Sequence, residues 1–245
     1  MSTRYGPMPD RESIMTRSAP GGAGYSPVAV KIGGSLACSE HLGDWLSACR
    51  AACLPLAIVP GGGPFADAVR SAQTRMGLGD AASHRMALLA MAQYGEALAS
   101  LAPGFVTASS QDEIHRALDS GQIPVWIPLD ILSGADGVEE SWDVTSDTLA
   151  AWLAVRLGSK TLVLVKHEPL PENSLTFEEM ADAGLIDRAL PAFLANHELR
   201  VIWLGSSEAA ALNDRLAGTV LSPRPVAEQR ATAYSERQQQ EQQQQ

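Results

Sequence analysis

One lysine of this sequence stands at the end of an apolar run and directly before two glycines. The run 28–32 has the composition of a buried strand, in which Lys31 shares a face with Ala29. A buried lysine is unfavourable unless an anion or a carboxylate meets it, and glycines let a ligand approach backbone N–H groups closely. This stretch predicts a site for a negatively charged group, although a lysine that reaches solvent beside an ordinary turn explains it equally well. The residues that follow the strand are Gly33, Gly34 and Ser35.

A second apolar run, 54–59, also ends in glycines, and Pro64 then suits the first position of a helix. The two glycine clusters start 28 residues apart (61 − 33 = 28), which is about one strand–helix–strand unit. Neither the G-x-G-x-x-G pattern of dinucleotide sites nor the Gly-Lys-Ser/Thr of a P-loop occurs here. Because the lysine precedes its glycines, a phosphate lying across the loop would meet it at the strand end. The second cluster consists of Gly61, Gly62 and Gly63.

A polar segment precedes the helix expected at about 145–157. Asp143 or Thr145 is expected to cap this helix, and an acid in a first turn favours the helix dipole, which is a purely structural explanation for Asp143. In a phosphate site, Asp147, which follows Thr145 and Ser146, could hold lysines in place and keep them protonated.

Three further side chains are candidates, each with an ordinary alternative. Lys166 ends a strand and could be a second cation for a nucleotide phosphate, or a surface lysine. Arg70 could contact a phosphate or carboxylate through two hydrogen bonds, or be a solvated arginine. His84 could bind substrate, or be a buried histidine with its hydrogen bonds satisfied.

The elements that must position these residues alternate between short apolar strands and amphipathic helices, which predicts an α/β fold with a mostly parallel sheet. Ligands gather at the carboxyl ends of strands in such sheets, where most of the candidates lie. We expect Phe65, Val69 and Met76 to face a core, and 123–129, with its two prolines, to be an edge strand or to end early. The other expected strands are 105–108, 161–165 and 199–204, and the main helices are 40–52, 82–101, 111–118, 178–183, 189–195 and 208–216.

Composition narrows the function classes. The net charge of −10 argues against a nucleic acid partner. Three cysteines without a CxxC pair predict no metal site and no disulfide framework. No apolar run has transmembrane length, and we expect a cytoplasmic protein without a membrane partner. Segment 1–26 and the glutamine-rich tail 222–245 are expected to be disordered, on either side of one domain at 27–221.

Three motifs, at 31–35, 59–66 and 145–150, resemble the amino acid kinase family, which includes acetylglutamate, aspartate, uridylate and isopentenyl phosphate kinases. The resemblance covers about 28–220 and implies a three-layer αβα sandwich of the carbamate kinase-like type. It also implies ATP and Mg²⁺ as cofactors, a small-molecule phosphorylated substrate and a homo-oligomer.

The resemblance also implies roles for the candidates. Lys31 would contact the phosphoryl group in transfer, Asp147 would orient the lysines, and Lys166 would face the nucleotide phosphates. Gly33, Gly34 and Ser35 would line the path of the phosphates, and Gly61–Gly63 would receive the acceptor, together with Arg70, His84, Asp143, Thr145 and Ser146.

Within this family, the stretches 83–91 and 142–147 and the pair 69–70 resemble the kinases of aminomethylfuran-methanol phosphate, which act in one-carbon cofactor biosynthesis. A uridylate- or acyl-acid-type kinase is the alternative within the family. One departure is the loop at Lys166, which reads Lys-His-Glu-Pro where the family pattern has Asp-Gly. The nucleotide side is therefore expected to be altered or lost, and a noncatalytic protein that binds a small anion stays open as a further alternative.

Overall fold

The computed structural model describes residues 26–132, 138–170 and 175–221. Almost all of the N-terminal segment and the whole glutamine-rich tail that were predicted to be disordered lie outside these residues. The described strands form one six-stranded sheet, ordered β3-β4-β2-β1-β5-β6, and every registered pair in it is parallel. The predicted α/β class is confirmed. The strands are β1 (Val28–Ile32), β2 (Leu56–Pro60), β3 (Phe105–Ala108), β4 (Ile123–Trp126), β5 (Thr161–Lys166) and β6 (Arg200–Gly205).

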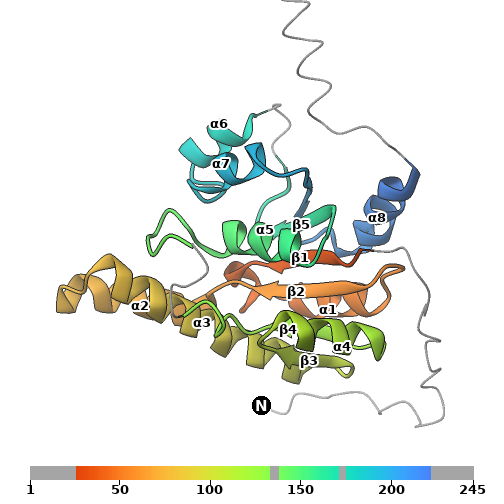
Figure 1. Cartoon of the computed structure of the whole chain (residues 1–245), viewed down its shortest axis with the longest axis horizontal. Helices are drawn as coiled ribbons and strands as arrows, with labels where there is room; N and C mark the ends of the chain where they lie inside the picture. The colour runs from red at the N-terminus through yellow and green to blue at the C-terminus, as the bar shows by residue number, and fades with distance from the viewer. Residues whose placement is uncertain (1–25, 133–137, 171–174, 222–245) are drawn as a thin grey trace, which may run out of the picture.

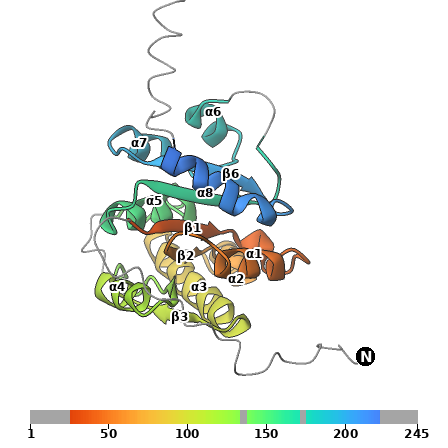
Figure 2. The same cartoon turned by 90° about the vertical axis from the view of Figure 1, so that its right-hand side faces the viewer.

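Helices cover both faces of this sheet (Figures 1 and 2). One face packs against α1, the C-terminal half of α3, and α8, while the other packs against α4, α5 and α7. None of the described helices combines the length and the apolar character that crossing a bilayer requires. The helices are α1 (Leu42–Arg50), α2 (Gly63–Met76), α3 (Asp80–Leu101), α4 (Gln111–Asp119), α5 (Ser146–Arg156), α6 (Phe177–Asp182), α7 (Leu190–Ala195) and α8 (Leu212–Leu221), with short 3₁₀ turns at Gly34–Leu36 and Ala209–Ala211.

The alternation of side chains along the central strands separates two cores. Val28, Val30 and Ile32 of β1 belong to the core that contains α1 and α8, whereas Ala29 belongs to the core that contains α5. Lys31 shares the face of Ala29, as the strand period predicts. On β5, Leu162 and Leu164 also face α5. Lys166 lies two residues after Leu164 and therefore points to the same side of the sheet. The two lysines therefore lie on the α5 side of adjacent strands.

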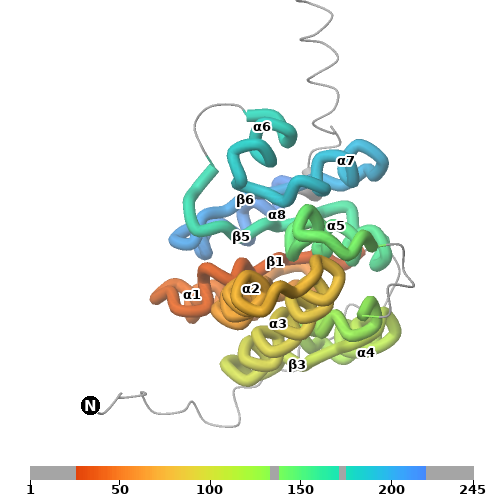
Figure 3. The backbone as a smooth tube through the Cα atoms, turned by 90° about the vertical axis from the view of Figure 1, so that its left-hand side faces the viewer, coloured from red at the N-terminus to blue at the C-terminus, as the bar shows by residue number. Residues whose placement is uncertain are grey.

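Helix α2 buries less than its sequence suggests. Of its three predicted core residues, only Val69 is buried. The exposed fraction is 36% for Phe65 and 70% for Met76. The helix projects beyond the sheet and packs along α3 (Figures 1 and 3), so only one narrow stripe of it is covered. The prediction that Phe65 and Met76 face a core was wrong.

Strand β4 lies inside the sheet, between β3 and β2, so the edge-strand interpretation was wrong. The alternative that it ends early is confirmed, since it stops at Trp126. A proline offers no N–H to the ladder, and the pairing of β4 with β2 is limited to one registered pair, Ile58 with Val125, next to Pro124.

The two glycine loops pack against each other, backbone to backbone. A Cβ atom added to Gly34 would lie 2.4 Å from the nitrogen of Gly63, and one added to Gly61 would lie 2.4 Å from the nitrogen of Gly34. The N–H of Gly61 also donates to the carbonyl oxygen of Ile32, at 2.8 Å. The absence of side chains at Gly34 and Gly61 is therefore needed for the loops to meet.

Replacing Gly34 with alanine should separate the two loops, because the new Cβ would stand within 2.7 Å of two backbone atoms of Gly63. We expect the free energy of unfolding to fall by about 1–3 kcal/mol, as for other overpacked sites. Denaturant unfolding followed by circular dichroism measures this change.

The matched control is Gly43→Ala in α1, where an added Cβ meets nothing within 4 Å. An alanine in an open helical position should stabilise the chain by about 0.5–1 kcal/mol. Equal effects of the two substitutions would contradict a tight contact between the loops.

Candidate active site

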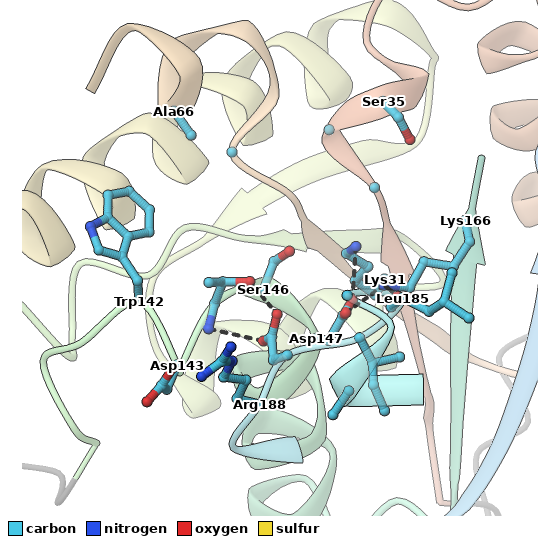
Figure 4. Close-up of a pocket in the computed structure, with 18 of the residues that line it drawn as sticks. Lys31, Ser35, Ala66, Trp142, Asp143, Ser146, Asp147, Lys166, Leu185 and Arg188 are labelled. Atoms are coloured by element: carbon cyan, nitrogen blue, oxygen red, sulfur yellow. Dashed lines mark hydrogen bonds and ion pairs between the residues drawn. The ribbon is translucent and has the colours of Figure 1, made fainter. Parts of the chain in front are cut away.

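A cavity of about 750 Å³ opens at the carboxyl ends of β1, β2 and β5 (Figure 4). Its other walls are the start of α2, the start of α5, the end of α6 and the segment 184–188 that follows α6. The chain continues from β1 to β2 on one side, while β5 lies on the other side of β1. Such a reversal of strand order opens a crevice where ligands bind in α/β folds. The volume lies within the range of small-molecule sites.

The floor of this cavity is a buried ion cluster formed by one carboxylate between two ammonium groups. Nζ of Lys31 lies 2.9 Å from one carboxylate oxygen of Asp147, and Nζ of Lys166 lies 2.5 Å from the other. The Asp147 side chain is only 4% exposed. Nζ of Lys166 also donates to the carbonyl oxygen of Leu185, at 2.7 Å, and lies over the ring of Trp203. The predicted grouping of Lys31, Asp147 and Lys166 is thus present in the structure.

The charges of this cluster shift two of its pKa values in ways that follow from their surroundings. Burial alone would raise the pKa of the Asp147 carboxyl, but Lys31 and Lys166 outweigh burial and hold that pKa below its ordinary value. Burial and the like charge of Lys31 lower the pKa of Lys166, against the opposing attraction of Asp147. With both lysines protonated, the cluster carries one net positive charge, which would attract an anionic ligand.

Asp187, which we did not predict from the sequence, fixes the start of α5. Its carboxylate accepts hydrogen bonds from the N–H groups of Thr145 and Thr148, at 2.9 Å each, and from the Thr145 hydroxyl. Thr145 stands at the N-cap position, but its side chain makes no capping hydrogen bond, because its hydroxyl donates to Asp187. Burial and the nearby charge of Asp147 raise the pKa of Asp187. Asp187 therefore fixes the first turn of α5, which carries Asp147.

Most of the other predicted site residues line the cavity, and two do not. Gly61 is buried against the first glycine loop, and His84 lines a smaller neighbouring pocket. Arg70 is exposed, pairs with Asp67 at 2.7 Å and lies over the ring of Trp142. The predicted residues that line the cavity outside the ion cluster are Gly33, Gly34, Ser35, Gly62, Gly63, Arg70, Asp143, Thr145 and Ser146.

Trp142 and Arg188 also line the cavity and were not predicted. In Figure 4, Trp142 lies at the opposite side of the cavity from Lys31 and Lys166. Trp142 belongs to one of the stretches on which the resemblance rests, so the sequence did contain a signal for it. Arg188 and Asp187 follow a short helix in a segment without a motif, and nothing in their local sequence distinguishes them.

The segment after Lys166 packs onto the end of β6. The carbonyl oxygen of His167 accepts hydrogen bonds from the N–H and the hydroxyl of Ser206, at 3.3 and 2.8 Å. The indole N–H of Trp203 donates to the carbonyl oxygen of Glu168, at 2.9 Å. Neither His167 nor Glu168 is among the residues that line the cavity. Of the described residues 166–170, which stand where the family pattern has Asp-Gly, only Lys166 lines the cavity.

Comparisons with known proteins agree with this geometry. Residues 26–169 match the Amino acid kinase family. Over 110 residues the chain is 29% identical to [5-(aminomethyl)furan-3-yl]methyl phosphate kinase of Methanocaldococcus jannaschii, a match that covers 44% of this chain and spans only half, 50%, of that relative.

Two solved structures are also similar. The uridylate kinase of Archaeoglobus fulgidus has 14% sequence identity and a TM-score of 0.58, over 78% of this chain and 96% of that chain. This likeness supports the fold alone. The carbamate kinase of Giardia lamblia bound to AMP-PNP has 14% sequence identity and a TM-score of 0.45, over 79% of this chain and 95% of that chain.

The lowered pKa of Lys166 predicts how anion binding depends on pH. As the pH rises through this pKa, which lies below the ordinary value of 10.5, Lys166 loses its charge and the cavity loses affinity for an anion. Titration calorimetry with inorganic pyrophosphate should therefore show an alkaline loss of affinity with a midpoint below 10.5. In Lys166→Arg the loss should move to higher pH, because a guanidinium stays protonated.

The control for this experiment is Lys160→Arg, which changes an exposed lysine that is not among the cavity residues. It should leave the pH profile unchanged. An alkaline midpoint that is the same in Lys166→Arg and in the original protein would assign the titration to another group.

Replacing Asp147 with asparagine should leave two buried ammonium groups without a counter-charge. We expect the free energy of unfolding at neutral pH to fall by about 3–5 kcal/mol, as for other broken buried ion pairs. Since the pKa of Asp147 is lowered by folding, its stabilising contribution is present above its unfolded pKa and is lost as the pH falls through the folded value. Chemical denaturation across the acid range measures both effects.

Asp119→Asn, at the exposed C-terminal end of α4, serves as the control and should change stability by no more than about 0.5 kcal/mol. If Asp147→Asn were as mild as this control, the cluster would not be the buried charge pairing described above.

Proposed function

The chain belongs to the amino acid kinase family, and from this premise we propose that it transfers the γ-phosphoryl group of ATP to the phosphate group of a small metabolite. The observation that carries the proposal is the buried cluster of Lys31, Asp147 and Lys166 on the floor of the cavity. Phosphoryl transfer needs little covalent help from a protein, and depends on positioning and on neutralising charge. Two ammonium groups held by one carboxylate meet that requirement.

In the proposed reaction, an oxygen of the acceptor phosphate attacks the γ-phosphorus atom. A new P–O bond forms as the bond between the γ-phosphorus and the β,γ-bridging oxygen breaks, so that ADP leaves and the acceptor becomes a diphosphate. Lys31 contacts the group in transfer, and Lys166 balances the charge that develops on the donor phosphates. Asp147 keeps both ammonium groups in place.

The ion cluster favours an acceptor that is already ionised. A phosphate monoester has a second pKa of about 6 and carries a reactive anionic oxygen at neutral pH, so its attack needs no general base. Asp147 is held between two lysines that lower its pKa, so it is too weakly basic to serve as a general base. A hydroxyl acceptor would need such a base.

The residues of the cavity fit ATP and Mg²⁺ in different ways. Kinases of this family use ATP, and Lys31, Lys166 and the first glycine loop would hold its phosphates. Among the described residues, no group of three His, Cys, Asp or Glu side chains could hold a metal ion. Mg²⁺ is commonly bound through substrate phosphates with one or two carboxylates. Here the nucleotide phosphates would supply most of its ligands, and the ion would neutralise charge between the two substrates.

The best candidate for the acceptor is aminomethylfuran-methanol phosphate, which would place the chain in one-carbon cofactor biosynthesis. It is supported by the name of the curated relative and by the residues shared with that branch of the family. Arg70 and Arg188 both line the cavity and would lie beside such an acceptor. A uridylate- or acyl-acid-type acceptor is the alternative within the family.

One observation favours a second candidate function, the binding of a small anion without catalysis. The segment His167–Pro169 packs against β6 and contributes nothing to the cavity, although family members use a loop at this place for the nucleotide. A protein that kept the ion cluster and had lost the donor site would still attract anions. The following experiment separates the two functions.

Incubation with ATP labelled in the γ-phosphate, Mg²⁺ and aminomethylfuran-methanol phosphate should give a labelled diphosphate. Lys31→Ala should lower turnover by about 100-fold or more, because the positive charge on the transferred group is lost. Lys160→Ala, which removes an exposed lysine outside the cavity, is the matched control and should retain full turnover.

Three results would decide against the proposed kinase. Retained turnover in Lys31→Ala would remove this lysine from the mechanism. A labelled product only with a uridylate or a carboxylate would identify one of the alternative acceptors. No labelled product with any acceptor, together with no rise in melting temperature on adding ATP, would favour the anion-binding function.

A further inference from the structure

A second, smaller pocket adjoins the cavity on the side of α2 and α3. Its volume is about 50 Å³, enough for a few non-hydrogen atoms. Since the two spaces share part of their walls, a ligand in the cavity can extend one substituent into the pocket. The shared residues are Gly62, Ala66, Arg70, Trp142, Thr145 and Ser146.

Apolar side chains form most of the remaining wall of this pocket. Leu88 and Met91 of α3, Val144 and Leu149 are all buried. A polar substituent that enters such a space loses its water and needs a hydrogen-bonding partner in return. The pocket would therefore reject most polar groups unless one wall supplies that partner.

His84 supplies it. The side chain is 4% exposed, and its Nδ1 lies 3.0 Å from the carbonyl oxygen of Ser141. A carbonyl oxygen only accepts hydrogen bonds, so Nδ1 carries a proton, and Nε2 is an acceptor whenever the ring is neutral. Among the described residues, none donates a hydrogen bond to Nε2. A buried side chain in the wall of this mostly apolar pocket thus carries an acceptor without a partner among the described residues.

Trp142 limits the pocket on the side of the cavity. Its indole N–H donates to Gln73, at 2.7 Å, and the guanidinium of Arg70 lies 5.1 Å from its ring centre. Both contacts hold the ring in place as a fixed wall. The pocket lies next to Arg70 and away from Lys166, which is the end of the cavity where the proposed function places the acceptor.

We propose that this pocket selects the acceptor, and that it takes a small substituent bearing an N–H or O–H group that donates to Nε2 of His84. The inference rests on the proposed function, because it assumes that an acceptor occupies the neighbouring cavity. The chemical class that follows is a phosphate monoester with an amine or a hydroxyl at the end remote from the phosphate. A substituent of the same size without a hydrogen-bond donor would leave Nε2 unpaired.

The test uses three furan-methanol phosphates that differ only in the remote substituent, which is aminomethyl, hydroxymethyl or methyl. Calorimetric titration without ATP measures binding separately from transfer. We expect the aminomethyl and hydroxymethyl ligands to bind about tenfold more tightly than the methyl ligand, the amount that one net hydrogen bond supplies.

Two variants distinguish recognition by Nε2 from a structural role of His84. His84→Asn places an amide N–H near the position of Nδ1, so it can still donate to Ser141, but it has no group at the position of Nε2. It should lose the preference between the ligands and keep a melting temperature close to that of the original chain. His84→Gln places an amide oxygen near the position of Nε2 and should restore part of the preference.

Equal binding of the three ligands, binding of none of them, or an unchanged preference in His84→Asn would each overturn the inference. The proposed function fails in a different way. If the ligands show the expected preference in binding but none of them accepts a phosphoryl group from ATP, the pocket selects as inferred and the protein is not the proposed kinase.

Discussion

The pairing of one buried carboxylate with a buried and a half-buried ammonium group is the interaction on which the rest of the site depends. Lys31 comes from β1, Lys166 from β5 and Asp147 from the first turn of α5. Each ammonium would be unfavourable in this interior without the carboxylate, and the carboxylate would be unfavourable without the ammonium groups. The cluster therefore holds two adjacent strands and a helix together.

Residues outside the three charged side chains hold this cluster in position. Asp187 binds two N–H groups and one hydroxyl at the start of α5, which fixes the turn that carries Asp147. Leu185, in the same segment, accepts a hydrogen bond from Lys166. The segment 185–187 thus contacts both the carboxylate's helix and one of its cations. The glycine loops have a comparable role at the mouth of the cavity, where close contact between Gly34 and Gly63 sets the distance between β1 and α2.

The sequence allowed the fold class and the grouping of Lys31, Asp147 and Lys166 to be predicted, because both follow from local patterns. Apolar strands in alternation with helices imply a parallel sheet, and residues that follow its strands meet at one edge.

Asp187 could not be found in this way, since its partners are about 40 residues away in the chain and its role arises only from tertiary contact. Phe65 and Met76 were misplaced because an apolar residue on a helix does not reveal how much of that helix is covered. The interior position of β4 was missed because a proline lowers the number of ladder bonds without forbidding a central strand.

Placing Lys166 inside β5 also ties the assembly of the sheet to the chemistry of the site. In the register observed, Lys31 pairs with Leu164, and Lys166 lies two residues further along the same face. A shift of β5 by one residue would turn Lys166 toward the core that contains α1 and present Val165 to Asp147. An unpaired ammonium would then be buried on one side and a half-neutralised carboxylate on the other, so the cluster discriminates against misaligned strands. The charges at the floor of the cavity therefore also favour one alignment of β5 beside β1.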